Sequence, residues 1–489
     1  GYYAMTINAG AGSVSFGGAV GNTQALSLLS VTSTHATGIT LTGNVTTRGN
    51  QDYFGKVLLN ADTTITTTNN GYVNITGTVS SGLIASNVGV SFYNSADLAG
   101  GASSIGSSSY FDSGSSGVAA RYRGSYTYSY SCGYSSICYS TSYSPVYTYS
   151  VTVTGGQVTV YTDYGFNGSA TTYGIGNWNL ASGVVYSYVA SNTSTPAAFA
   201  ISSGTGAITL GSTVGASRSL LSVALTSSSQ ISLGGSVSTL QAQSYTGPTI
   251  LAAAVSLATT NDSADISGAT KNTSNDISFS STLNSATSTA RNLTVATGFK
   301  HITFTGAIGG TQALSAMDLT STGTTTFSAS VVAASVVQNA ASGITAVNGG
   351  SISTTGLQTY NNAVTLGADS TLTASTVTFN NTVSGAYGLA LVGNAVFGNA
   401  VADTVVLSGT NKALSVTGNT SIYTNTITTS GTQTYGDATS DSITLFNTSV
   451  LTISTAAANK DITFNGSLNG SALGRLLTIN AGTGAIAFN

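Results

Sequence analysis

Internal repetition is the feature that most limits what this chain can fold into. The stretch VSFGGAVGNTQALSLLSVTS, from Val14 to Ser33, aligns without a gap with ITFTGAIGGTQALSAMDLTS, from Ile302 to Ser321. Looser copies of the same pattern begin at Ile208, Ile277 and Ile462. Repeats with periods of about 20–50 residues are typical of architectures in which short structural units stack on one another.

A second repeat begins with Gln-x-Tyr. QDYFGKVLLNADTTIT starts at Gln51 and QTYNNAVTLGADSTLT starts at Gln358, with degenerate versions at Gln243 and Gln433. In both repeats apolar residues alternate with polar ones, which is the period of a half-buried β-strand. Each short strand is followed by Gly, Asn or Asp-Ser, which favour turns. The repeats therefore predict an all-β fold built from short strands.

A single strand-and-turn unit cannot bury its inner face, whereas stacked units can, because each strand bonds to the next. Some neighbouring copies lie about two dozen residues apart, as from Ile277 to Ile302 and from Ile462 to Ile486. This spacing predicts a β-solenoid of roughly fifteen turns, about 70 Å long at ~4.8 Å per turn. A row of β-sandwich domains is the alternative, although no unit is long enough to close a sandwich of its own.

Composition narrows the class of protein further. Only 5% of the 489 residues are charged, and the formal net charge is −3. Phosphate binding needs clustered Lys and Arg, so we expect no nucleic-acid partner. No apolar run is long enough to predict a membrane span. The chain has no initiator Met and no leader segment, so we expect that it is processed or lies within a longer protein.

The repeats also resemble those of a known class of proteins. The G-[NG]-T-Q-A-L segments, the Q-x-Y-x-x-x-V-x-L-x-A repeats and the stretch VTFNNTVSGAYGL at Val377 are similar to the β-strand repeats of very large bacterial surface proteins. Those proteins are the filamentous-haemagglutinin-like adhesins and related exoproteins. The resemblance implies a right-handed parallel β-solenoid (β-helix), export, and a role at the bacterial cell surface.

The two ends of the chain share a motif. TINAGAGSVSF begins at Thr6 and TINAGTGAIAFN begins at Thr478, in equivalent positions. Either the chain is one period of a giant repetitive protein, or its end is shaped to receive another copy. Solenoids normally end in polar caps, and neither end here has one, so we predict that units stack end to end into a fibre. A chance match between similar turns is the alternative.

One region interrupts the repeats. Between residues 90 and 198 the motifs fade and Tyr becomes frequent, so we expect β-solenoid over 1–89, a Tyr-rich β insert over 90–198 and β-solenoid over 199–489. The only two cysteines, Cys132 and Cys138, lie in this insert. In an exported protein we expect them to form an intrachain disulfide.

Residues 121–154 of the insert predict a β-hairpin. One register pairs Tyr130 with Tyr139 and puts all the tyrosines on one face. The rival register pairs Cys132 with Cys138 and divides the tyrosines between two faces. Such a tyrosine face either packs within the protein or contacts a partner, such as a neighbouring fibre or a glycan, because Tyr is favoured at binding surfaces. The candidate partner-contact residues are Tyr122, Tyr126, Tyr128, Tyr130, Tyr139, Tyr143, Tyr147 and Tyr149.

Residue types that carry catalysis or bind metals are sparse. The two histidines, His35 and His301, are expected in turns or at the surface. The closest aspartate pairs are Asp262 with Asp265 and Asp437 with Asp441. These pairs lie in turn-rich segments, where Asp usually bonds the backbone. Calcium nonapeptides, phosphate loops and metal-ligand spacings of Cys and His are missing from the sequence. We therefore predict that the protein is not an enzyme and uses no metal or cofactor.

The low charge also fits a stacked architecture. A charge repeated in every turn would repel its neighbours, whereas Thr, Ser and Asn ladders can hydrogen-bond from turn to turn. We expect a structural extracellular protein, a unit of a bacterial surface fibre or adhesin. Its expected partners are copies of itself or adjoining repeats end to end, with lateral contacts to other fibres or to glycans. The alternative is a glycan- or surface-binding module displayed on a solenoid spacer.

Overall fold

The computed structural model describes residues 2–82, 196–259, 275–472 and 474–489 in full, and the backbone of further strands between residues 90 and 191. Contacts divide the chain into two units. The first comprises residues 1–82, 196–262 and 271–489, and the second comprises residues 83–195 and 263–270. The described part is all-β, and it contains no helix that is long and apolar enough to cross a membrane.

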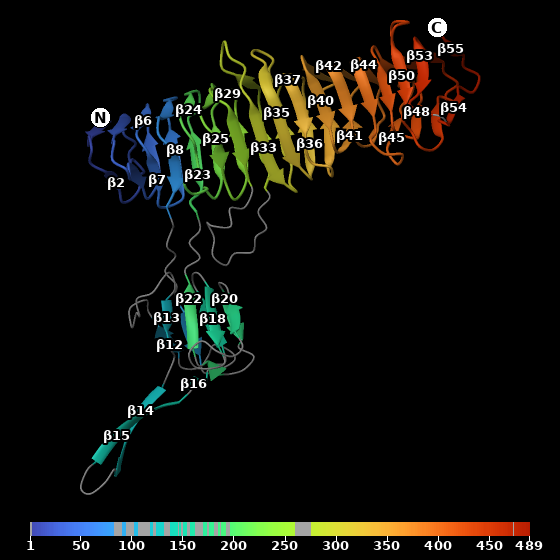
Figure 1. Ribbon diagram of the computed structural model, residues 1–489. Helices are drawn as coiled ribbons and strands as arrows, with labels where there is room; N and C mark the ends of the chain where they lie inside the picture. Colours follow the sequence, from blue (N-terminus) through green and yellow to red (C-terminus); the bar gives the residue numbers. More distant parts are fainter. Residues whose placement is uncertain are drawn as a thin grey trace. The chain divides into compact units, whose positions relative to one another are not determined.

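The first unit is a parallel β-solenoid of about 16 turns, as the repeats predict. Each turn, here called a coil, runs along three faces, and its strands pair in parallel with those of the next coil (Figure 1). Face 1 is a sheet of 15 strands. Its strands are β5 (Val45–Thr47), β8 (Thr63–Thr67), β23 (Phe199–Ser202), β25 (Val223–Thr226), β28 (Gln243–Thr246), β31 (Ile277–Phe279), β34 (Ile302–Phe304), β36 (Thr324–Phe327), β38 (Ile344–Val347), β41 (Ala363–Leu366), β43 (Val383–Gly385), β45 (Thr404–Leu407), β48 (Thr426–Thr429), β51 (Leu451–Ser454) and β54 (Leu477–Asn480).

Faces 2 and 3 join through three bent strands that run across both of them, β37 (Val331–Gln338), β42 (Ser370–Phe379) and β44 (Leu389–Phe397). The other strands of face 2 are β1 (Ala4–Asn8), β3 (Leu28–Thr32), β6 (Gln51–Phe54), β9 (Val73–Ile75), β24 (Ile208–Leu210), β26 (Ile231–Leu233), β29 (Thr249–Leu251), β32 (Leu283–Ser285), β39 (Ser351–Thr354), β46 (Leu414–Val416), β49 (Gln433–Tyr435), β52 (Ile462–Phe464) and β55 (Ile486–Phe488). Those of face 3 are β2 (Val14–Phe16), β4 (Ile39–Leu41), β7 (Val57–Leu59), β10 (Val79–Ser81), β27 (Val237–Ser238), β30 (Val255–Ala258), β33 (Leu293–Gly298), β35 (Leu314–Ser321), β40 (Leu357–Tyr360), β47 (Thr420–Ile422), β50 (Ser442–Leu445) and β53 (Ser467–Gly470). Isolated bridges at Val214 and Ile308 continue faces 3 and 2 where no strand is formed.

The spacing of the repeats predicts the coil correctly. Ile277 pairs directly with Ile302, and Ile462 pairs directly with Ile486. The copies nevertheless begin on different faces of the coil. The copy at Val14 begins on face 3, the copy at Ile208 on face 2 and the copy at Ile302 on face 1. The motif encodes a strand, a corner and the next strand, and this segment fits any of the three corners.

The shared end motif has the same property. Thr6 lies in β1 on face 2, whereas Thr478 lies in β54 on face 1. The expectation that the two residues are equivalent is therefore correct for the local strand and corner and wrong for the position around the coil.

The core is formed by alternate residues of every strand, which point into the solenoid. In β34, Ile302 and Phe304 are buried while Thr303 between them is only half-buried. Inward rings stack from coil to coil, because partners in parallel strands lie only about 5 Å apart. The longest stack among the described residues is Tyr245, Phe279, Phe304 and Phe327, with centroid separations of 4.7, 5.4 and 5.6 Å.

Side chains at the corners add hydrogen bonds between coils. The Oδ1 atom of Asn44 accepts the backbone N–H of Thr64 at 2.8 Å, and Oδ1 of Asp276 accepts the N–H of His301 at 2.9 Å. The same bond recurs at Asn50, Asn70, Asn284, Asn292, Asn394, Asn419, Asn459, Asp369 and Asp461. Neutral Asn side chains therefore do bond from coil to coil, and several aspartates are used in the same way.

The second unit contains antiparallel sheets. They are formed by β11 (Val90–Tyr93), β12 (Ala102–Ile105), β13 (Val118–Ala120), β14 (Gly124–Ser131), β15 (Ile137–Ser144), β16 (Val146–Tyr147), β17 (Ser150–Val153), β18 (Gln157–Tyr161), β19 (Ala170–Tyr173), β20 (Gly176–Asn179), β21 (Val184–Val185) and β22 (Ser187–Ser191). The chain leaves the solenoid after Gly82 and returns at Pro196, at the corner between β10 on face 3 and β23 on face 1. Residues 260–274 lie between β30 and β31 and thus interrupt the same corner. We call this corner the exit corner.

Candidate functional site

The predicted hairpin of the insert is formed by β14 and β15, which pair antiparallel with Tyr130 opposite Cys138. This register is neither of the two considered from the sequence. The side chains of Tyr122, Tyr126, Tyr128, Tyr130, Tyr139, Tyr143, Tyr147 and Tyr149 lie outside the described residues, as does Cys132. The partner-contact face and the Cys132–Cys138 disulfide therefore stay predictions.

His35, His301 and the pair Asp437 and Asp441 lie in the turn and surface positions expected of them. The Nδ1 atom of His301 accepts the backbone N–H of Thr324 at 3.0 Å, on an exposed corner. The Asp441 carboxylate accepts the N–H groups of Asp437 and Ala438 at 2.9 and 3.0 Å, which closes a turn. Asp262 and Asp265 lie outside the described residues. Within the described ranges no group of His, Cys or Asp side chains could hold a metal ion.

The Gln-x-Tyr motif forms a buried hydrogen-bond cluster. In the copy at Gln358, Nε2 donates to the carbonyl of Ile352 at 3.0 Å and to that of Thr373, in the next coil, at 2.9 Å. The Tyr360 hydroxyl donates to Oε1 at 3.0 Å. Thr354, four residues before the glutamine, lies 3.4 Å from Nε2. The same cluster recurs around Gln51, Gln243 and Gln433, and all four glutamines are fully buried.

Each cluster ties a corner to the next coil, so its role is structural. The threonine is the last residue of a strand or directly follows it, and the glutamine is the first or second residue of the next strand, on whichever face the motif falls. Burial raises the pKa of the hydroxyls of Tyr53, Tyr245, Tyr360 and Tyr435, which keeps them neutral donors. The sequence reveals Gln-x-Tyr, but the complete signal is T-x-x-x-Q-x-Y, with a threonine four residues before each glutamine.

The last described coil exposes the inward-pointing side chains that are buried in earlier coils. Ile486 and Phe488 of β55 are 44% and 58% exposed, although their partners Ile462 and Phe464 in the preceding coil are fully buried. The ring of Phe488 stacks on Phe464 with centroids 5.1 Å apart, which leaves its other side uncovered. Ile486 and Phe488 thus form an apolar pair that no described coil covers.

The first coil has the same character. Met5 and Ile7 of β1 are partly exposed, whereas their partners Leu29 and Val31 are fully buried. Tyr3, just before β1, is 80% exposed. The first and last described coils therefore expose inward-pointing residues of the kind that the coils between them bury.

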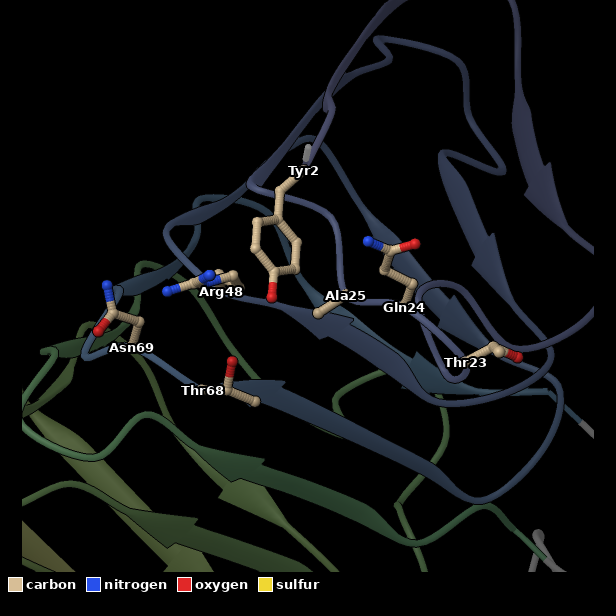
Figure 2. Close-up of a pocket in the computed structure, with 7 residues that line it drawn as sticks. All are labelled: Tyr2, Thr23, Gln24, Ala25, Arg48, Thr68 and Asn69. Atoms are coloured by element: carbon tan, nitrogen blue, oxygen red, sulfur yellow. The ribbon is translucent and has the colours of Figure 1, made fainter.

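A shallow hollow lies beside each of these coils. At the first coil a hollow of about 380 Å³ is lined by Tyr2, Thr23, Gln24, Ala25, Arg48, Thr68 and Asn69 (Figure 2). The Arg48 guanidinium lies over the Tyr2 ring, 4.2 Å from its centroid. Beside β53 a second hollow, of about 580 Å³, is lined by Leu445, Leu468, Asn469, Gly470, Ala472, Gly474 and Arg475. Neither lining contains a carboxylate or a histidine.

The geometry defines the class of protein: a parallel β-solenoid repeat protein, compatible with the β-helix adhesins. Comparison with protein-family models, with curated proteins and with solved structures found no match.

Proposed function

We propose that the protein is a non-enzymatic structural unit of a bacterial extracellular fibre or adhesin, of the filamentous-haemagglutinin-like kind, and that its units stack end to end. The observation that carries this proposal is the recurrence of one strand–corner–strand unit on all three faces of the solenoid, so that one coil is a template for the next. The corners at residues 8–12 and 480–484 have the same hydrogen bonds, which is the match that the stacking of further units requires. An unpaired strand edge also templates the addition of another strand.

The polar side chains support a scaffold role. Asp276, Asp441 and Asp461 each accept backbone N–H groups, which uses these carboxylates for holding corners and coils together. Only 5% of the residues are charged. The coils of two copies can therefore approach each other without the electrostatic repulsion that like charges repeated in every coil would cause. A surface rich in Ser, Thr and Asn suits long assemblies.

Electron microscopy and light scattering of the purified chain test the proposal. We expect rods several units long whose number rises with protein concentration. The variant Phe488→Asp places a charge in the exposed inward row and should stop elongation, while Ala487→Asp, on the outward side of the same strand, should elongate as the parent does. Single rods at every concentration would refute the stacking.

The alternative, a ligand-binding module on a solenoid spacer, makes a different prediction. Single rods would then bind a glycan through the insert, and a variant in which Gly82 is joined to Pro196 would lose that binding. A glycan array with both proteins distinguishes the two functions.

A further inference from the structure

One patch on face 2 differs from the other outward surfaces of the solenoid. Among the described strands of the solenoid only two side chains are charged, Asp52 of β6 and Asp318 of β35. Among the same strands only the ring of Phe54 is an outward-pointing aromatic. Asp52 and Phe54 lie two residues apart in β6, so both point outward on the same face. Two kinds of side chain that are rare on this surface therefore occur together.

The next coil adds two side chains to the patch. Asp52 pairs with Asn74 of β9, and Tyr72 directly precedes β9. The Tyr72 hydroxyl donates to Oδ2 of Asp52 at 3.0 Å, and Nδ2 of Asn74 donates to Oδ1 of Asp52 at 3.2 Å. The carboxylate is thus held in place by two donors from the next coil. We call Asp52, Phe54, Tyr72 and Asn74 the face 2 patch.

The hydrogen bonds of Asp52 differ from those of the aspartates that hold corners. Asp276 and Asp461 accept backbone N–H groups of the next coil. Asp52 instead lies within a strand whose backbone already pairs with β3 and β9, and both of its donors are side chains. A carboxylate offers about four acceptor positions, so two donors leave about half of them free for a ligand.

Both rings of the patch are open to solvent. Phe54 and Tyr72 are each 40% exposed. The coils that contain them have a further coil on either side, with β3 before β6 and β24 after β9. The partner of Phe54 in the preceding coil is Thr32, which is too short to cover a ring. The exposure of these rings is therefore a property of the middle of a stack of coils.

We propose that the face 2 patch binds a carbohydrate chain. The C–H face of a sugar ring is apolar and packs on an aromatic ring, while its hydroxyl groups pair with carboxylate and amide groups. Phe54 and Tyr72 supply the rings, and Asp52 and Asn74 supply the polar groups between them. This partner goes beyond the proposed scaffold role, and the site does not depend on end-to-end stacking.

The layout of the patch favours an extended ligand. The backbone N–H of Tyr72 donates to Oδ1 of Asn50, which lies four residues before Phe54. The two aromatic residues are therefore about 13 Å apart along the strands at ~3.3 Å per residue, the length of about two or three sugar residues. A carboxylate and no cationic side chain belong to the patch, which disfavours a phosphate or another anion.

Titration calorimetry of the full chain tests the site, with cellohexaose, mannohexaose and chitohexaose as probes. We expect one of these uncharged hexasaccharides to bind the parent protein. Phe54→Ala should weaken that binding about ten-fold because a ring contact is lost. Asp52→Asn should also weaken it about ten-fold, because it replaces a charged acceptor with a neutral amide. Both side chains point outward, so the melting temperatures of the two variants should stay close to that of the parent.

Asp318→Asn is the matched control, because it removes the other charge of the described solenoid strands, on face 3. It should bind the hexasaccharide as the parent does. If no hexasaccharide binds the parent, or if Phe54→Ala and Asp52→Asn bind as tightly as the parent, the proposal is overturned. Binding that disappears only when Gly82 is joined to Pro196 would also overturn it. None of these outcomes bears on end-to-end stacking, which light scattering measures separately.

Discussion

The buried Gln358–Tyr360 pair allows a sharp test of how the corners are held. Replacing Gln358 with Ile removes two amide hydrogen bonds and leaves the Tyr360 hydroxyl without its acceptor. The lost bonds cost about 1 kcal/mol each and the unpaired hydroxyl about 1–3 kcal/mol. The apolar surface that Ile buries offsets about 1 kcal/mol, so we expect the free energy of unfolding to fall by about 2–4 kcal/mol.

The next coil supplies the matched reference. Val377 and Phe379 pair directly with Gln358 and Tyr360, so the same inward positions are occupied there by an apolar pair. The double variant Gln358→Ile, Tyr360→Phe imitates that coil and removes the unpaired hydroxyl. We therefore expect it to be about 1–3 kcal/mol more stable than Gln358→Ile alone, although each substitution by itself is destabilising.

The measurement combines denaturant unfolding followed by circular dichroism with hydrogen exchange of peptides from the affected coils. A solenoid is stabilised coil by coil, so faster exchange should be confined to the coils on either side of β40. If the double variant is no more stable than Gln358→Ile, the Tyr360–Gln358 hydrogen bond does not stabilise the corner and the reasoning is wrong.

Three further predictions concern other parts of the solenoid. Burial raises the pKa values of the hydroxyls of Tyr53, Tyr245, Tyr360 and Tyr435. The free energy of folding that these neutral hydroxyls contribute is therefore complete below about pH 10, the ordinary pKa of tyrosine, and is lost as the pH rises above it. Their phenolate absorbance should appear only as the solenoid unfolds, and four additional phenolates in the folded protein would contradict this. Asp441→Ala removes the acceptor of two N–H groups and should cost about 1–2 kcal/mol in thermal unfolding, whereas exposed Asp437→Ala should have little effect. Gly247→Ala places a Cβ 1.8 Å from the Ser227 carbonyl oxygen at a φ of 138°, so it should lower the free energy of unfolding by about 2 kcal/mol or more. A Cβ on Gly17 meets no atom within 4 Å, so Gly17→Ala should leave the stability unchanged. Equal melting temperatures for the two variants would refute the clash.

The repeats predict the coil because strand alternation and spacing are local properties of the sequence. Ile277 and Ile302 pair as their spacing indicates. The face on which each copy lies does not follow from the sequence, because all three corners accept the same strand–corner–strand segment. Val14 and Ile302 begin nearly identical segments and lie on different faces.

The candidate site could be predicted only in part. The matching end motifs at Thr6 and Thr478 direct attention to the end coils, but exposure of Phe488 and Ile486 depends on which neighbours cover them. The role of Gln-x-Tyr is also hidden in the sequence, since a buried glutamine needs its threonine and a carbonyl of the next coil as partners. Those partners come together only when the coils are stacked.

The exit corner shows which part of a coil accepts added chain. Residues 83–195 and residues 260–274 both enter between a strand of face 3 and a strand of face 1. On either side of the longer insertion, β8 and β23 still pair in parallel, with Thr63 opposite Phe199. Chain added at this corner therefore leaves the ladder of parallel strands unbroken, so its length can vary without any change in how the coils stack.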